Sequence, residues 1–302
     1  MRNTFLRVLL EIARENPRVI MLTGDVGFKV LDEFRAECPQ QFYNVGVAEQ
    51  NLTGVAAGLA LSGHVVLTYS IGNFPTLRCL EQVRNDVCYH NADVKIVTVG
   101  GGMAYGSLGF SHLATEDLAI LRALPGMTVV APGDPVEVEK LLPQIIEQPG
   151  PVYFRLGRAG EKRIHDPTTE VILGQPTQAR AGSDVLLLTT GGMLAVALEA
   201  AEMLESEEID TAVWSVHTLK PLDSHVICDL ASRFEAIITC EEHTILGGLG
   251  GAVAEVLQEA RVSKIFRRFG LPSFPMGIGS QDHMRMANHL DAGTLRELVR
   301  SF

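Results

Sequence analysis

One carboxylate in this chain stands where the surrounding pattern predicts burial. Glu49 follows a short apolar run, residues 42–47, and begins a helical pattern with apolar residues at positions 52, 55, 56 and 59. Gly63 is placed to end that helix. Buried helices rich in Ala, Gly, Val and Leu rarely begin with a carboxylate unless another group pairs with it. We therefore expect a partner for Glu49. The alternative is an acid that only complements the helix dipole.

Three glycine-rich stretches invite a phosphate-binding interpretation, and each lacks a necessary feature. Residues 100–102 have neither the spacing of a dinucleotide-binding loop nor the lysine of a P-loop. Residues 247–251 follow Glu241 and Glu242, which would repel a phosphate. Residues 24–26, with Asn51, resemble only faintly the signature that holds magnesium and diphosphate in thiamine enzymes. We expect no diphosphate site in this chain.

Short apolar runs alternate with helical patterns along the whole chain, which predicts α/β architecture with mainly parallel sheets covered on both faces. A polar stretch rich in Pro and Gly interrupts this alternation. We expect two three-layer α/β/α domains, residues 1–160 and 183–302, joined by a linker at 161–182. The predicted strands are 19–23, 65–69, 94–99, 127–131, 152–154, 184–190, 211–216, 236–240 and 265–269.

Composition excludes several classes of protein. The net charge of −11 and the absence of a long basic run argue against nucleic-acid binding. No apolar run approaches the length of a membrane span. The five cysteines are scattered, without a CxxC pair, which is typical of a reduced, cytoplasmic protein without a zinc site. The N-terminus reads as an amphipathic helix without the features of a signal peptide.

Several ordered motifs resemble the transketolase family. The A-E-Q-N around Glu49 matches the family's G-I-A-E-Q-N segment, and residues 78–86, R-C-L-E-Q-V-R-N-D, are similar to its R-A-F-D-Q-I-R-N-D helix. Residues 111–127 resemble its T-H…E-D-L-A-x-x-R-x-x-P-x-M pattern. Residues 154–158 resemble the R-Y-P-R of deoxyxylulose-phosphate synthases, and residues 218–223 resemble a motif of the C-terminal domain. Family enzymes have three domains, and this chain resembles the last two, the pyrimidine-binding and C-terminal domains.

The resemblance implies a subunit of a thiamine-diphosphate-dependent transferase that moves two-carbon ketol units between sugars. Glu49 would hydrogen-bond N1′ of the cofactor's aminopyrimidine and favour its imino tautomer. A large partner subunit would carry the diphosphate and Mg2+ site, and two large and two small chains would form a heterotetramer. The implied cofactor contacts are Glu49, Asp25, Ile71, Phe74 and Arg78, and the implied substrate contacts are His112, also in a catalytic role, and Arg155.

For three of these residues a purely structural role competes. His112 is alternatively a structural histidine, Asp25 a loop-capping aspartate, and Arg155 a member of a surface ion pair. The sequence also departs from the family. The aromatic positions three and six residues before Arg78 hold Pro75 and Gly72, so that Phe74, together with Ile71, is expected to provide the stacking face.

Departures at the sugar site affect the expected substrate. The acidic residue expected four positions before the histidine is Leu108, and no basic residue stands near Gly100 or Gly101. We expect a modified, nucleotide-linked or unphosphorylated sugar in place of an ordinary pentose phosphate. Two alternatives for the whole chain remain. They are the beta subunit of a 2-oxo acid dehydrogenase and a non-catalytic binding or regulatory protein with the same fold.

Overall fold

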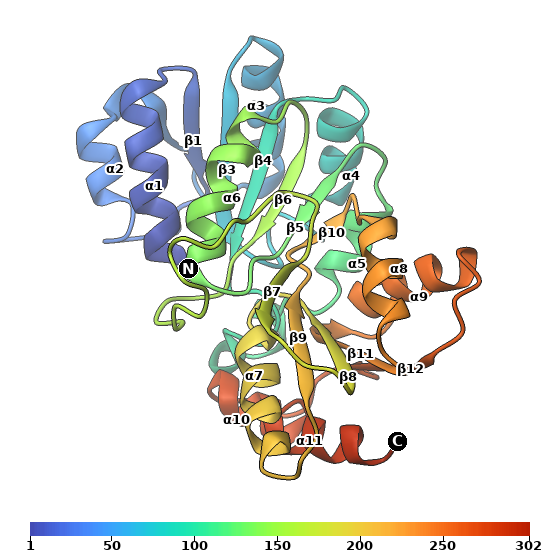
Figure 1. The fold of residues 1–302 in the computed structure, drawn as a ribbon. Coiled ribbons are helices and arrows are strands. Elements are labelled where there is room, and N and C mark those ends of the chain that lie inside the picture. The colour runs from blue at the N-terminus through green and yellow to red at the C-terminus, as the bar shows by residue number, and fades with distance from the viewer.

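The computed structural model describes residues 1–302, which form two sheets, each with helices on both faces (Figure 1). The first sheet has the order β10-β5-β6-β4-β3-β1-β2, and every neighbouring pair is parallel except β10 with β5. Its strands are β1 (Val19–Thr23), β2 (Phe42–Asn44), β3 (Val65–Ile71), β4 (Val94–Val99), β5 (Thr128–Val130), β6 (Val152–Arg155) and β10 (Thr218–Lys220).

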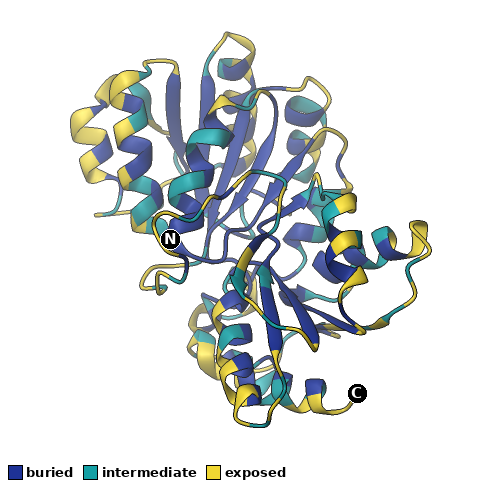
Figure 2. Cartoon of the chain, viewed as in Figure 1, coloured by how far each residue is buried: buried dark blue, intermediate teal, exposed yellow.

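Alternate residues of the strands in this first sheet enter two different cores. In β1, Ile20 and Leu22 face α3 (Glu49–Leu61) and the helical segment formed by α4 (Leu80–Gln82) and a π-helical turn at Val83–Cys88. Val19 and Met21 face α1 (Arg2–Glu15) and α6 (Pro135–Glu147). Because both faces are covered, the strands other than the edge strand β2 are buried along nearly their whole length (Figure 2).

The second sheet has the order β12-β11-β8-β9-β7. Its strands are β7 (Thr177–Arg180), β8 (Val185–Thr189), β9 (Thr211–Ser215), β11 (Ala236–Thr244) and β12 (Ile265–Leu271). The helices α7 (Met193–Glu205) and α11 (Ala292–Arg300) pack on one face, and α8 (Ser224–Ser232) and α9 (Leu249–Glu259) pack on the other. The shorter helices are α2 (Asp32–Glu37), α5 (Asp117–Ala123) and α10 (Gln281–Ala287).

The expected α/β fold class is confirmed, and each of the predicted strands is present within a few residues of its expected limits. The strand β2 lies within the apolar run noted at residues 42–47, and two further strands were not expected. The polar stretch predicted as a linker contains β7, which pairs antiparallel with β9. The short strand β10 leaves the second half of the chain and pairs antiparallel with β5 of the first sheet. One apolar core is also continuous between the sheets, since Val129 and Leu118 share it with Leu186 and Leu249.

None of the helices is long and apolar enough to cross a membrane.

Candidate active site

Glu49 lies at the beginning of α3, directly after a tight turn that follows β2. Gly46 adopts a left-handed φ of 78° in this turn, a conformation that favours glycine. Gly24, at the end of β1, passes so close that an added Cβ would lie 3.3 Å from the carbonyl oxygen of Gly46. The turn directs the Glu49 side chain inward, where it is only 3% exposed. The helix ends at Leu61, and Gly63 follows it with a φ of 96°, as expected.

The partner of Glu49 is Arg78. Arg78 Nη1 donates to Glu49 Oε2 at 2.7 Å, while the arginine side chain itself remains 50% exposed. No hydrogen bond within the chain reaches the other carboxylate oxygen, Oε1. Oε1 does not belong to the fully buried polar atoms that lack a partner, so it remains reachable from outside the chain. The thiol of Cys79 beside this carboxylate adds no second negative charge, because burial raises the pKa of the thiol and keeps it protonated. Glu49 therefore presents one oxygen that is free to accept a hydrogen bond from a ligand.

An aromatic ring and an imidazole lie beside this ion pair. The guanidinium of Arg78 lies 4.9 Å from the centroid of the Phe74 ring, on its face. The edge of the His112 ring contacts Phe74, with 5.2 Å between the ring centroids. Asn73 ties the two loops together by donating to the carbonyl of Ser111 at 3.0 Å. Glu49, Arg78, Phe74 and His112 are thus linked in a continuous series of contacts.

Steric packing explains why one of the two expected aromatic side chains, the one at Gly72, is absent. A Cβ at Gly72 would lie 2.7 Å from the Cβ of Ala114, so the packing leaves no space for a larger side chain there. Pro75 is buried. Ile71 ends β3 and is partly exposed. Phe74 is therefore the aromatic side chain that this loop presents next to Glu49.

Asp25 lies at the carboxyl end of β1, next to the turn that carries Glu49. Its backbone has a φ of 59°, and its amide donates to Asn44 Oδ1 at 3.0 Å. Asn44 Nδ2 donates in return to Asp25 Oδ1 at 3.1 Å. Through these contacts Asp25 caps the loop, which is the structural role that competes with a cofactor contact. Asp25 is also exposed, and its second carboxylate oxygen remains accessible.

Arg155 is buried between the two halves of the chain. It is 4% exposed, its Nε donates to Asp117 Oδ2 at 2.8 Å, and its Nη2 donates to the carbonyl oxygens of Ala114 and Glu242 at 2.7 and 3.1 Å. Burial by itself lowers the pKa of Arg155, but the charge and hydrogen bond of Asp117, together with Tyr153 and Glu242, outweigh this effect, so the pKa lies above its ordinary value. The expectation of a surface ion pair is therefore wrong, because the pair is internal. In this conformation the guanidinium faces the protein.

Arg158, the second arginine of the same motif, is the exposed one. Its guanidinium lies 5.4 Å from the centroid of the Tyr105 ring and forms no ion pair. It follows β6 at the carboxyl edge of the sheet, the edge at which Asp25 and Ile71 also lie. The motif thus places Arg158, and not Arg155, at the surface. Sequence reasoning missed this residue, since spacing alone does not separate the inner arginine from the outer one.

The glycine-rich stretches serve internal packing. Gly101 lies against Arg155, and Gly102 lies against the carboxylate of Glu242. Glu241 accepts hydrogen bonds from the amides of Leu249 and Gly250 at 2.8 Å each, so its carboxylate already occupies the N-terminus of α9. These contacts agree with the expectation that these two stretches bind no phosphate.

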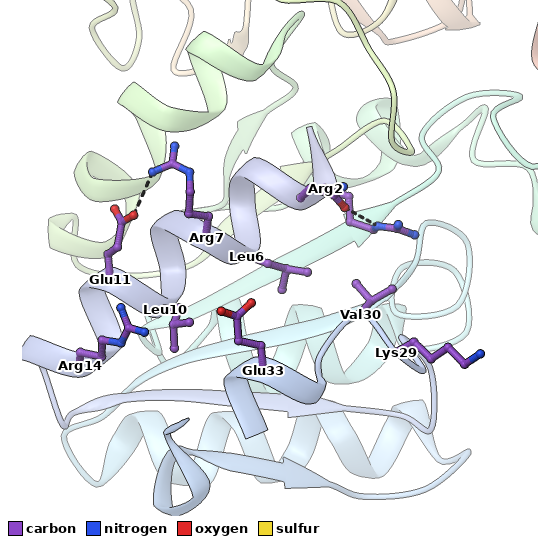
Figure 3. Close-up of a pocket in the computed structure, with 10 residues that line it drawn as sticks. Arg2, Leu6, Arg7, Leu10, Glu11, Arg14, Lys29, Val30 and Glu33 are labelled. Atoms are coloured by element: carbon purple, nitrogen blue, oxygen red, sulfur yellow. Dashed lines mark hydrogen bonds and ion pairs between the residues drawn. The ribbon is translucent and has the colours of Figure 1, made fainter. Parts of the chain in front are cut away.

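A separate surface pocket lies between α1 and the segment at residues 29–33 (Figure 3). Its walls are mainly charged. Arg7 donates a hydrogen bond to Glu11, and Lys29 lies at the rim. α1 covers the sheet face opposite to α3, and the pocket contains none of the residues predicted for the site.

No group of three or more His, Cys, Asp or Glu side chains is arranged to hold a metal ion.

Comparison with known proteins matches both halves of the chain to family models. Residues 1–160 match "Transketolase, pyrimidine binding domain", and residues 174–294 match "Transketolase, C-terminal domain". The chain is 37% identical over 302 residues to the 6-deoxy-6-sulfo-D-fructose transketolase subunit SqwH of Clostridium sp. (strain MSTE9), covering 100% of this chain and 92% of that protein.

A second relative is one of the subunits of the apulose-4-phosphate transketolase of Phocaeicola vulgatus. It is 38% identical over 273 residues, which cover 90% of this chain and 87% of that protein. Among solved structures, one described as "Split gene transketolase, inactive beta4 tetramer" superposes with a TM-score of 0.91 at 35% identity. The match covers 99% of this chain and 97% of that one.

Proposed function

This chain belongs to the transketolase family, of which it spans the pyrimidine-binding and C-terminal domains, and we propose that it provides Glu49 to thiamine diphosphate in a two-chain transketolase. The observation that carries the proposal is the buried carboxylate of Glu49, which has one oxygen held by Arg78 and the other without a donor. A ring nitrogen that carries a proton supplies the missing donor. The neighbouring ring of Phe74 supplies an apolar surface for a planar group.

When bound, thiamine diphosphate supplies the nucleophilic carbon that removes a two-carbon ketol unit from one sugar and transfers it to another. Glu49 would accept the hydrogen bond of the aminopyrimidine and thereby favour the tautomer in which the amino nitrogen acts as a base. Arg78 keeps the carboxylate in an ion pair and fixes its orientation through contact with Phe74. His112, which also contacts Phe74, would face substrate hydroxyls, and the free oxygen of Asp25 and the side chain of Ile71 would border the cofactor.

Binding of the diphosphate and of Mg2+ is assigned to a large partner subunit. The stretches of this chain that resemble phosphate loops lack the required residues, and two of them pack against buried carboxylates or Arg155. The similarity to a split-gene transketolase described as an inactive tetramer of beta chains agrees with a division of the site between two chains. We assign the active form to a heterotetramer with two copies of each chain.

The substrate is assigned to sugars that carry an end group other than an ordinary phosphate, or none. Leu108, which is 55% exposed, stands where an acidic residue would sense a sugar hydroxyl. The two relatives named above act, by their names, on 6-deoxy-6-sulfo-D-fructose and on apulose-4-phosphate, so relatives of this chain differ in substrate. The exposed guanidinium of Arg158 suits an anionic end group such as a sulfonate.

The test is a reconstitution assay with purified large subunit. We expect ketol transfer only when both chains, thiamine diphosphate and Mg2+ are present. Donor ketoses with phosphate, sulfonate and free hydroxyl ends, compared by kcat/KM, identify the end group. A mixture that decarboxylates 2-oxo acids but transfers no ketol unit from any donor contradicts the proposal.

A further inference from the structure

A group of buried polar side chains lies where the first domain, the 161–182 segment and the second domain meet. Its members are Asp134 and Glu137 of the α6 N-terminus, His165 of the connecting segment, and Ser215 and His217 beside the end of β9. All five are less than 10% exposed. None of these residues belongs to the Glu49 site. We call this group the junction cluster.

Backbone amides donate hydrogen bonds to most of the carboxylate oxygens of Asp134 and Glu137. Asp134 caps α6 by accepting from the amide of Glu137 at 2.9 Å, and its other oxygen accepts from the amides of Ile164 and His165 at 2.7 and 2.9 Å. Glu137 Oε2 accepts from the amide of Gly133, the residue before the N-cap, at 2.6 Å. Glu137 Oε1 has no hydrogen-bond partner, although the residue is fully buried.

His165 faces both carboxylates without a well-directed hydrogen bond to either. Its Nδ1 lies 3.3 Å from Asp134 Oδ1, and its Nε2 lies 3.9 Å from Glu137 Oε1. Neither ring nitrogen makes a hydrogen bond. A separation of 3.9 Å is too long for a direct hydrogen bond, yet one water molecule can bridge the two atoms.

The second domain contributes two more polar atoms without partners. The hydroxyl of Ser215 lies beside the Glu137 carboxylate and makes no well-directed bond. His217 is close enough to His165 to sense its charge. Its Nδ1 lies 2.9 Å from the hydroxyl of Thr218, which leaves Nε2 without a partner.

We propose that the junction cluster is a buried water site, in which at least one ordered water molecule bridges Glu137 Oε1 and His165 Nε2 and connects them to Ser215 and His217. Four residues from three segments would otherwise leave polar atoms unpaired in one buried region, which folded proteins rarely tolerate. Water suits this site because the surrounding atoms include acceptors and donors, and buried waters typically make about three hydrogen bonds. No metal-binding arrangement is present here.

The site also has consequences for protonation. Burial raises the pKa of Glu137 to about 7 and lowers the pKa of His217 to about 3. Burial by itself lowers the pKa of His165, but Asp134 and Glu137 outweigh it and raise the pKa above its ordinary value. For Glu137 and His165 the folded state holds the proton more tightly than the unfolded state. The stabilising contribution of Glu137 is therefore lost as the pH rises from about 4.5 to about 7, and that of His165 is lost as the pH rises above the ordinary pKa of histidine. For His217 stability is lost as the pH falls below the ordinary pKa of histidine.

The direct test is a high-resolution crystal structure of the full chain at about pH 6.5. We expect density for a water molecule about 2.6–3.2 Å from both Glu137 Oε1 and His165 Nε2. Density with an anomalous signal, which would mean a metal ion, or a dry site in which the side chains bond directly to one another, would overturn the proposal.

A second test follows the melting temperature between about pH 5 and 7.5, the range in which Glu137 holds its proton mainly in the folded state. Over this range the wild-type chain should lose about 3–5 °C more than Glu137→Gln, because glutamine keeps the shape of the side chain and cannot titrate. The matched control is Glu139→Gln on the same helix, whose carboxylate pairs with Arg7 at the surface and should leave the profile unchanged. Identical profiles for wild type and Glu137→Gln would contradict a titrating Glu137 in the site.

Discussion

Replacing Glu49 with glutamine should lower kcat for ketol transfer by the reconstituted enzyme by about 10²- to 10⁴-fold, the range typical of lost proton-transfer catalysis. The amide has nearly the same shape, so α3 and its turn should remain intact. It carries no charge, however, and binds the aminopyrimidine proton more weakly than a carboxylate does. Steady-state kinetics with a saturating donor ketose measure the effect.

A suitable control for this variant is Glu33→Gln. Glu33 also stands in the first turn of a helix, α2, but is exposed and lines the surface pocket beside α1, on the sheet face opposite to α3. Its replacement should leave kcat within about twofold of wild type, since exposed surface substitutions usually have little effect. If Glu49→Gln retained wild-type kcat with an unchanged melting temperature, Glu49 would be excluded from proton transfer.

Replacing Arg155 with methionine should lower the free energy of unfolding by about 3–5 kcal/mol, the usual cost of removing one partner from a buried ion pair. Asp117 is 2% exposed and would keep its charge without the guanidinium. The carbonyls of Ala114 and Glu242 would also lose their donor. Because Ala114 precedes α5 and Glu242 lies in β11, the loss should loosen the contact between the two domains. Urea denaturation of the chain alone measures the effect.

Arg163→Met provides the matched control for the arginine change. Its guanidinium pairs with Glu139 at 3.4 Å and is 48% exposed, so we expect a loss of at most about 1 kcal/mol. The double variant Arg155→Met/Asp117→Asn should recover part of the stability, because it removes the unpaired charge. Equal stabilities of Arg155→Met and wild type would mean that this network does not hold the domains together.

Most of the architecture could be predicted from the sequence because buried parallel strands are apolar throughout. β1, β4 and β8 have buried residues at every position, and their apolar runs mark them directly. β7 and β10 carry no such signal. They are short, contain Gln178 or Lys220, and form by pairing at sheet edges with strands that lie elsewhere in the chain. Such pairing depends on tertiary structure that local patterns do not contain.

The same contrast between local patterns and long-range contacts applies to the site. A carboxylate at the start of an apolar helix identifies Glu49, and the structure places it in a buried position. The partner of Glu49 is 29 residues away, and the family resemblance was needed to bring Arg78 into consideration. Arg155 and Arg158 look equivalent in sequence. Their different environments arise because Asp117, 38 residues away, lies next to only the first of them.

The central claim is that this chain holds the pyrimidine half of a site that a second chain completes. Isothermal titration calorimetry of thiamine diphosphate with Mg2+ tests it most directly, first with this chain alone and then with an equimolar mixture of this chain and the large subunit. We predict no saturable binding to the chain alone and saturable binding to the mixture. Tight binding of the complete cofactor to the chain alone would contradict the claim, since it would require a diphosphate site within these 302 residues.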